Sequence, residues 1–518
     1  MELAAPESVL EAAMRRDAAA LQRLLSVAGV RVNERDASGR TALLWCCEYS
    51  EGFGRGRGRF KWAAGAEEKP EKAEDVEDGP GPFERCVEAL LAHGADPTVE
   101  DNHGSSAVLL ASFRNSLYSL NCLLAAGDGP LRRKLEALIE KPTKDGRTPL
   151  MWAVATGSKA CARRLLDLGA DVQRVDHMEV SSLMLASYEE GPNSSDEVDM
   201  RDAEDEEAET LVQLLLRHGA SVEASDCNGR TPLFYAIMGA SRNAAFELLE
   251  EGAHVSIHDE HGVTPLLLAV DMGDEDMVRL LVSSGAEVDA PDAQGRTPLA
   301  WACFAGFASN ARLLLEAGAN PTLQDSRGMS PLMLAAFKAN FDCVQEIVDS
   351  ANDEMLGILL RQESKDVRSP LLWAAASVAN QQAASSVIRL LLNAGADKQK
   401  ATGQGSTALL LAAHKGNTAG AIELIAHGAN LFDHDEAGRN ALHRAVLSGR
   451  IDTVAAIVAA GGAALLHEED KSGRTPTFLA AQTHHAAAIA EYLREVEEAA
   501  QRDGVQSIDS LESSTESA

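Results

Sequence analysis

The sequence from Gln294 to Asp325 reads QGRTPLAWACFAGFASNARLLLEAGANPTLQD, and the motif near its start, Gly-Arg-Thr-Pro-Leu, recurs along the chain. Related copies begin at Gly146, Gly229, Gly262, Gly295, Gly328 and Gly473. The copies from Gly229 to Gly328 are 33 residues apart, and each is preceded by an apolar run that ends in Gly-Ala. A fixed period of this length is typical of a protein built from small repeated helical units.

The motif can be explained by local backbone chemistry without a ligand. Thr297 is a favourable helix N-cap, and Pro298 fits the first helical position, where a missing N–H costs nothing. The glycine permits a tight turn, and the Gly of each closing Gly-Ala ends a second helix. No copy fits G-x-x-x-x-G-K-[ST] or follows a strand in a βαβ unit, so a phosphate-binding loop is disfavoured.

These residues closely resemble the ankyrin repeat, whose pattern D-x-x-G-x-T-P-L-H-x-A leads into two antiparallel helices and a closing G-A-D. Degenerate copies begin at Gly39, Gly104, Glu179, Val367, Gly405 and Gly438, which brings the total to about twelve repeats. The resemblance implies an all-α ankyrin-repeat solenoid with short β-hairpin-like loops. The family's histidine after T-P-L is kept only at His443, so we expect weaker hydrogen bonding between neighbouring hairpins.

The spacing of the repeats also predicts the domain organisation. We expect an N-terminal capping half-repeat over residues 1–35, the repeat array over 36–500, and a disordered acidic and Ser-rich tail over 501–518. Spacings above 33 indicate disordered inserts at about 51–83 and 189–209, each between the two helices of a repeat. Shorter additions near residues 130–142 and 352–364 are expected to lengthen helices or hairpins.

Charge, composition and motifs disfavour a nucleic-acid-binding protein, a membrane protein and an enzyme. The 79 acidic and 47 basic residues give a formal net charge of −32, which disfavours binding to nucleic acid or anionic membranes. No signal peptide is recognisable, no apolar run is long enough to span a bilayer, and the eight cysteines predict buried reduced thiols. Catalytic motifs are absent from the sequence. We expect a monomeric, non-enzymatic protein of the cytoplasm, and also of the nucleus, without membrane insertion, metal or cofactor.

The first insert supports an alternative function. It contains four basic residues among glycines and aromatics: Arg55, Arg57, Arg59 and Lys61. Such a segment can contact RNA phosphates and stack on bases, so an RNA-associated regulator is one alternative. The other explanation is a disordered loop whose basic half pairs with its own acidic half.

The second insert supports another alternative. Asp199 ends a DEVD sequence that resembles the site cut by executioner caspases, and Ser194 is followed by the acids that acidophilic kinases favour. A regulatory subunit controlled by cleavage or phosphorylation would use these residues, although such matches arise by chance in acidic runs.

The aromatic residues identify a candidate partner-binding surface. Four of the five tryptophans share one position after the turn motif with Tyr235: Trp45, Trp152, Trp301 and Trp373. In ankyrin-like stacks, the position one helical turn later is variable and faces the concave groove. We therefore predict that a partner protein binds on the concave face, at Tyr235, Met238, Trp301, Phe304 and Phe337. The alternative for the tryptophans is a core position between successive first helices.

Polar residues of the turns have simpler explanations. The arginine after the turn glycine, such as Arg296, is expected to pair locally with the aspartate four residues earlier, here Asp292. His254, His258 and His261 are the best metal candidates, and we interpret them as polar residues at hairpin tips. The function predicted from the sequence is a protein-binding scaffold or adaptor.

Overall fold

The computed structural model describes residues 8–15, 17–27, 29–48, 82–125, 130–189, 209–378, 380–482 and 487–500. Within these residues the regular elements are helices, and three isolated antiparallel bridges join Glu100 to Ser106, Val175 to Ser181 and Ala401 to Thr407. The predicted all-α fold with hairpin-like loops is therefore confirmed. The chain forms two compact units, residues 1–260 and residues 261–518.

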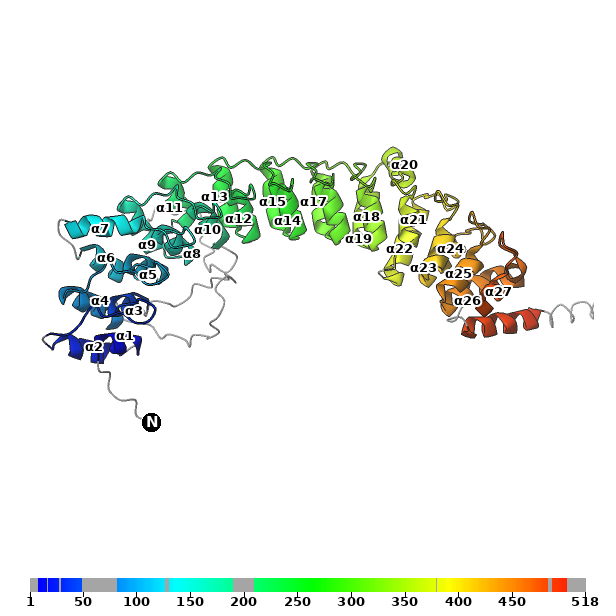
Figure 1. Cartoon of the computed structure of the whole chain (residues 1–518). Coiled ribbons are helices and arrows are strands. Elements are labelled where there is room, and N and C mark those ends of the chain that lie inside the picture. Colours follow the sequence, from blue (N-terminus) through cyan, green and yellow to red (C-terminus); the bar gives the residue numbers. More distant parts are fainter. Residues whose placement is uncertain are drawn as a thin grey trace, which may run out of the picture. The chain divides into compact units, whose positions relative to one another are not determined.

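In the unit of residues 1–260, first and second helices of the repeats alternate along the chain (Figure 1). The first helices are α1 (Val9–Met14), α3 (Ala42–Glu48), α5 (Ala107–Phe113), α8 (Pro149–Ala155), α10 (Ser182–Glu189) and α12 (Pro232–Met238). The second helices are α2 (Ala18–Leu25), α4 (Pro82–Ala92), α6 (Leu117–Ala125), α9 (Lys159–Asp167), α11 (Leu211–Arg217) and α13 (Arg242–Glu250).

The unit of residues 261–518 continues the same alternation. Its first helices are α14 (Pro265–Asp271), α16 (Pro298–Ala305), α18 (Pro331–Lys338), α21 (Pro370–Ala375), α23 (Ala408–Lys415), α25 (Ala441–Ser448) and α27 (Pro476–Gln482). Its second helices are α15 (Glu275–Ser283), α17 (Ala308–Glu316), α19 (Phe341–Ser350), α22 (Gln381–Asn393), α24 (Thr418–Ala426), α26 (Ile451–Gly461) and a helix over 487–500. A 3-10 helix, η1 (Gly462–His467), follows α26.

Packing of like helices builds the core of each unit. First helices contact the first helix of the next repeat; for example, α16 contacts α18. Second helices likewise contact the next second helix; for example, α17 contacts α19. The leucine after Thr-Pro or Ser-Pro is buried in each clear copy that has one: Leu150, Leu233, Leu266, Leu299 and Leu332. Because complete burial of a leucine contributes about 2 kcal/mol, the repeated leucine is a main source of stability.

The turn before α16 shows how the motif works. The Asp292 Oδ1 atom accepts hydrogen bonds from the backbone N–H groups of Gln294 at 2.8 Å and Arg296 at 2.9 Å. Gly295 has a φ of +77°, a left-handed conformation that favours glycine. The Thr297 hydroxyl accepts from the N–H of Ala300 at 3.2 Å, and Pro298 begins the helix. The motif is therefore a turn and helix cap, as the sequence predicts.

Backbone hydrogen bonds join successive turns. The N–H of Ser326 donates to the Gln294 carbonyl at 2.9 Å, and equivalent bonds recur in both units. His443 adds a side-chain link, because its Nε2 atom lies 3.0 Å from the Arg474 carbonyl oxygen of the next turn. Several repeats without this histidine keep the backbone bond, as between His177 and the Asp145 carbonyl.

The two shorter additions differ from the expectation that they lengthen existing elements. Each forms a separate helix after a second helix: α7 (Pro130–Ile139) and α20 (Asp353–Arg361), the latter at the upper edge of Figure 1. In the second case Asn352 caps the new helix, because its side chain accepts from the Met355 N–H at 2.8 Å. Because Asn352 is the N-cap of α20, α20 is a separate helix and not an extension of α19.

Candidate functional site

The five residues predicted to bind a partner belong to different units. Tyr235 and Met238 lie on α12 in residues 1–260, while Trp301, Phe304 and Phe337 lie on α16 and α18 in residues 261–518. Tyr235 and Met238 are half-buried, and the Tyr235 hydroxyl donates to Asp226 Oδ2 at 2.9 Å. Burial, followed by the charge of Asp226, raises the pKa of Tyr235 well above its usual range. The Tyr235 hydroxyl therefore links α12 to the turn that precedes this helix.

The tryptophans are neither fully buried nor free in a groove. Trp301 is half-buried, and its Nε1–H donates to Asp292 Oδ2 at 3.2 Å. The Arg296 guanidinium lies 4.2 Å from the centre of its ring system. Burial would raise the pKa of Asp292, but hydrogen bonds from Arg296 and Trp301 outweigh burial and lower it. The tryptophan therefore connects the first helix to its own turn.

The same arrangement occurs in the other unit. Trp45 donates from Nε1 to Asp36 Oδ2 at 3.0 Å, and Arg40 lies 5.1 Å from the centre of its ring system. The three residues have the same sequence spacing as Asp292, Arg296 and Trp301. This spacing is visible in the sequence and could have predicted the contact. The sequence suggests either a core position or a position in the groove for the tryptophans. Their half-burial and their hydrogen bonds to the turn fit neither alternative fully.

Phe304 and Phe337 are the exposed aromatic residues of this region, with 40% and 38% of their surface exposed. Phe304 packs edge-to-face on Trp301, with ring centres 6.4 Å apart and planes at 83°. Phe337 packs in the same way on Trp373, at 5.3 Å and 82°. Each phenylalanine therefore rests on a half-buried tryptophan and presents part of its ring outward. We call Trp301, Phe304, Phe337 and Trp373 the aromatic stripe.

Besides Arg296, two more cationic side chains contact the stripe. Lys338 Nζ lies 4.3 Å from the centre of the Phe304 ring, which joins α18 to α16. Arg368 lies 4.7 Å from the centre of the Trp373 ring system, and Trp373 packs against a buried cluster of Ala300, Met329, Met333 and Leu334. The sequence prediction omitted Trp373, Lys338 and Arg368 from the site. Lys338 lies on α18, and Arg368 and Trp373 belong to the next repeat, so stacking of the repeats brings them to Phe304 and Phe337.

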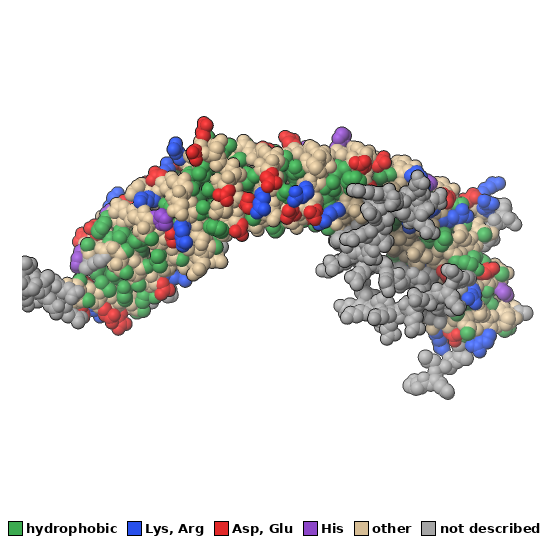
Figure 2. Space-filling model, turned by 180° about the vertical axis from the view of Figure 1, so that it is seen from behind, with side chains coloured by type: hydrophobic (Ala, Val, Ile, Leu, Met, Phe, Trp, Pro, Cys, Tyr) green, Lys and Arg blue, Asp and Glu red, His purple; other side chains and the backbone are tan. Residues whose placement is uncertain are grey.

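Ion pairs of the turn arginines are more varied than local pairing predicts. Arg296 pairs with Asp292 of its own turn at 2.7 Å. Four others reach the aspartate of the next turn: Arg40 to Asp101, Arg147 to Asp176, Arg230 to Asp259 and Arg439 to Asp470. These pairs link neighbouring repeats, and Figure 2 shows acidic and basic side chains interspersed on the face it presents. For Arg40, Arg230 and Arg439 the local prediction is wrong, because stacking brings the next aspartate within reach. Arg147 has Thr143 four residues earlier and so has no aspartate at that position.

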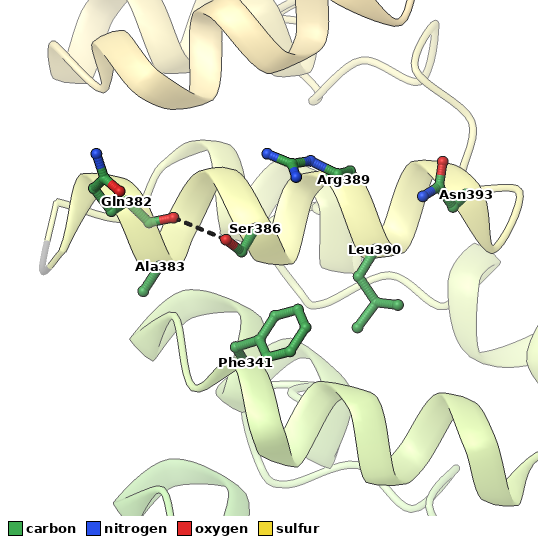
Figure 3. A pocket seen from close by; sticks show the side chains of 7 residues that line it. All are labelled: Phe341, Gln382, Ala383, Ser386, Arg389, Leu390 and Asn393. Carbon is green, nitrogen blue, oxygen red and sulfur yellow. Dashed lines mark hydrogen bonds between the residues drawn. The ribbon is translucent and has the colours of Figure 1, made fainter.

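A second candidate surface lies between the second helices α19 and α22 (Figure 3). An open depression of about 470 Å³ is lined by Phe341 from α19 and by Ala383, Ser386, Arg389 and Leu390 among the residues of α22. Phe341 is 37% exposed. Arg389 is held in a two-pronged ion pair with Glu423, with distances of 2.9 and 3.1 Å. This depression lies on second helices and is separate from the aromatic stripe.

The prediction of buried, reduced cysteines is met in part. Six cysteines are buried, Cys122 is half-buried and all eight are free, but Cys227 is exposed in a turn. Within the described ranges, no cluster of three or more His, Cys, Asp or Glu side chains could hold a metal ion, and no helix could cross a membrane. The candidate RNA contacts Arg55, Arg57, Arg59 and Lys61, and the candidate modification sites Ser194 and Asp199, lie outside the described residues.

Comparison with curated proteins finds partial relatives. The chain is 32% identical over 150 residues to the B-cell lymphoma 3 protein homolog of Mus musculus, which covers 29% of each protein. It is 30% identical over 168 residues to the human B-cell lymphoma 3 protein, covering 29% of this chain and 36% of that one. An 86-residue match at 35% identity to the E3 ubiquitin-protein ligase KEG of Arabidopsis thaliana covers 16% of this chain and 5% of that protein. The chain therefore matches well under half the length of these relatives.

One solved structure and one family model are also similar to parts of the chain. The crystal structure of the ankyrin repeat domain of Bcl-3, titled a unique member of the IkappaB protein family, aligns with a TM-score of 0.39 and 24% identity. The alignment covers 47% of this chain and 98% of that one. The family model described as ankyrin repeats (3 copies) matches residues 81–176, 240–325, 288–358 and 371–465, more than half of the chain. The turn chemistry, the paired helices and this family model establish that the chain belongs to the ankyrin repeat family, whose repeats are protein–protein interaction modules.

Proposed function

We propose that this protein is a non-enzymatic scaffold or adaptor that binds a partner protein through the aromatic stripe of α16, α18 and α21. The supporting observation is the pair of exposed phenylalanines, Phe304 and Phe337, each set edge-to-face on a half-buried tryptophan in successive repeats. Aromatic side chains of this kind are frequent hot spots of protein interfaces.

The packing of the stripe favours binding energetically. An aromatic pair in edge-to-face geometry contributes about 0.5–1.5 kcal/mol beyond its buried area, so each phenylalanine ring is held in place before a partner arrives. A preordered side chain loses little conformational entropy on binding. Covering the exposed part of each ring would then contribute about 1 kcal/mol of apolar burial. Two such rings in adjacent repeats form a compact anchor for an apolar or aromatic partner side chain.

The test is affinity capture with the tagged full-length chain from a lysate of its source cells, analysed by quantitative mass spectrometry. We expect the variant Phe304→Ala/Phe337→Ala to lose a defined set of captured proteins. Because both rings are partly exposed, the thermal unfolding midpoint should change little, which separates lost binding from lost folding.

A matched variant controls for the loss of exposed phenylalanines in general. Phe341 and Phe432 have similar exposures, and both lie outside the stripe. The double variant Phe341→Ala/Phe432→Ala should capture the same proteins as the unchanged chain. If this control loses the partners and the stripe variant keeps them, the proposed site is wrong, and the depression beside α19 is the better candidate.

A further inference from the structure

We infer that the partner segment of the aromatic stripe is acidic as well as apolar, with carboxylates that bind a basic ridge beside the two phenylalanines. This inference rests on the proposed function and specifies the chemistry of the partner. The basic ridge consists of Lys338, His414, Lys415 and Arg450, at or just after the C-terminal ends of α18, α23 and α25. All four side chains are exposed.

The cations of the ridge differ from several other exposed cations of residues 261–518 in having no ion-pair partner among the described residues. Elsewhere in this unit several exposed cations are held in ion pairs: Arg279 with Glu275, Arg312 with Glu346, Arg389 with Glu423 and Lys400 with Glu363. In contrast, Lys338, Lys415 and Arg450 form no ion pair with any carboxylate in the described part of the chain. Their charge is therefore available to a partner.

Contacts between successive loops make the ridge continuous with the stripe. The Asn340 side-chain amide donates to the carbonyls of Cys303 at 2.8 Å and Phe304 at 3.2 Å, which joins the loop after α18 to the end of α16. The Lys338 ammonium itself lies over the Phe304 ring. One partner segment that covers Phe304 would therefore meet the Lys338 charge.

The other loops of the ridge are joined in the same way. The Gln381 side chain donates to the Gly416 carbonyl at 3.1 Å, which connects the loop after α21 to the loop after α23. The Arg450 side chain lies against Gly416, since a Cβ atom placed there would be 2.7 Å from Arg450 Cγ. Val378, 68% exposed in the loop after α21, supplies an apolar position between Lys338 and Lys415.

The charge around the ridge is positive although the whole chain is strongly acidic. No Asp or Glu occurs in the segments that end α16, α18, α21, α23 and α25, which are residues 304–307, 337–340, 375–380, 414–417 and 447–450. Partial burial of the His414 ring lowers its pKa, and the charges of Arg444, Lys415 and Arg439 lower it further, while the charge of Asp435 opposes them. The nearest acidic residues in sequence, Asp342 and Asp452, lie in the first turns of second helices, where the helix dipole favours them. A chain with a net charge of −32 thus has a local surface complementary to carboxylates.

The experiment is a selection of random peptides displayed on phage against the immobilised full-length chain. A generic electrostatic response of so acidic a protein would enrich basic peptides, whereas the ridge predicts acidic peptides that contain Phe, Leu or Trp. We expect a synthetic acidic peptide from the selection to bind the double charge reversal Lys338→Glu/Lys415→Glu at least about tenfold more weakly. Raised salt should weaken binding to the unchanged chain but not to this variant.

Two controls make the outcome decisive. Arg361→Glu reverses an exposed cation on α20, outside the stripe and the ridge, and should leave the affinity unchanged. The same peptide should also lose affinity for Phe304→Ala/Phe337→Ala. Enrichment of basic or uncharged peptides would overturn the acidic-partner inference, as would equal affinity for the charge-reversed variant. A dimer that the phenylalanine variant abolishes, measured by light scattering, would identify a second copy as the occupant and also overturn it.

These results are distinguishable from failure of the proposed function. If natural partners are lost with the phenylalanine variant and retained by the charge-reversed variant, the stripe binds proteins and only the inferred chemistry is wrong. If neither variant affects capture, the site itself is wrong.

Discussion

Exchanging glycine and valine between two turns would test whether the turn glycine is purely conformational. Val367 occupies the position that Gly295 holds in another repeat, and its φ of +55° lies in the left-handed region. For a β-branched residue this conformation is a genuine outlier, and the left-handed form costs a non-glycine residue about 1–2 kcal/mol. We therefore expect Val367→Gly to stabilise the protein.

The size of the effect follows from three opposing contributions. Relief of the left-handed strain contributes about 1–2 kcal/mol, and the greater flexibility of glycine in the unfolded chain opposes it by about 0.5–1 kcal/mol. The lost valine contacts are few, because the side chain is 39% exposed. The net stabilisation should be about 0.5–1 kcal/mol.

The reciprocal change Gly295→Val is the matched control. Gly295 has a φ of +77°, and a Cβ atom there would be 3.4 Å from the Ser326 backbone nitrogen. We expect a loss of about 1–2 kcal/mol from strain alone. Urea unfolding followed by circular dichroism would measure both variants, and hydrogen exchange of the amides after each turn would show that the effect is local. If both exchanges leave stability unchanged, the glycine is not needed for the turn, and the motif would require another explanation.

Three further predictions follow from the same contacts. Trp301→Phe keeps a ring over Arg296 but removes the donor to Asp292, so urea unfolding should show a loss of about 1 kcal/mol, and Asp292 should titrate at higher pH by NMR. Burial would raise the pKa of Asp470, but hydrogen bonds from Arg474 and the Ser472 N–H lower it to about 2 from an ordinary value of 3.8. Ionised Asp470 therefore stabilises the fold fully above about pH 4 and loses this effect as the pH falls toward 2, so acid should destabilise Asp470→Asn less than the unchanged chain in urea unfolding. Iodoacetamide labelling followed by mass spectrometry should modify exposed Cys227 first, whereas rapid labelling of the six buried thiols would contradict their burial.

The sequence predicts the repeat well because its chemistry is local. Asp292, Gly295, Thr297 and Pro298 form a turn and a helix cap through contacts within a few residues. The same pattern at a fixed spacing of 33 residues specifies stacked helical hairpins, since each hairpin leaves an apolar face that only a neighbour can bury. The exposed positions Phe304 and Phe337 could likewise be identified from their variable offset.

Tertiary structure alone decides which side chains meet across repeats. Lys338 reaches the Phe304 ring, and Trp373 receives Phe337, only because α16, α18 and α21 pack side by side. The additional helix α20 lies between α19 and α21 in the sequence, so the 33-residue period does not carry through to Trp373. The sequence determines each hairpin through local hydrogen bonds, but stacking assembles the stripe and the ridge, because, apart from local contacts such as that of Trp301 with Phe304, their contacts join residues about one repeat apart.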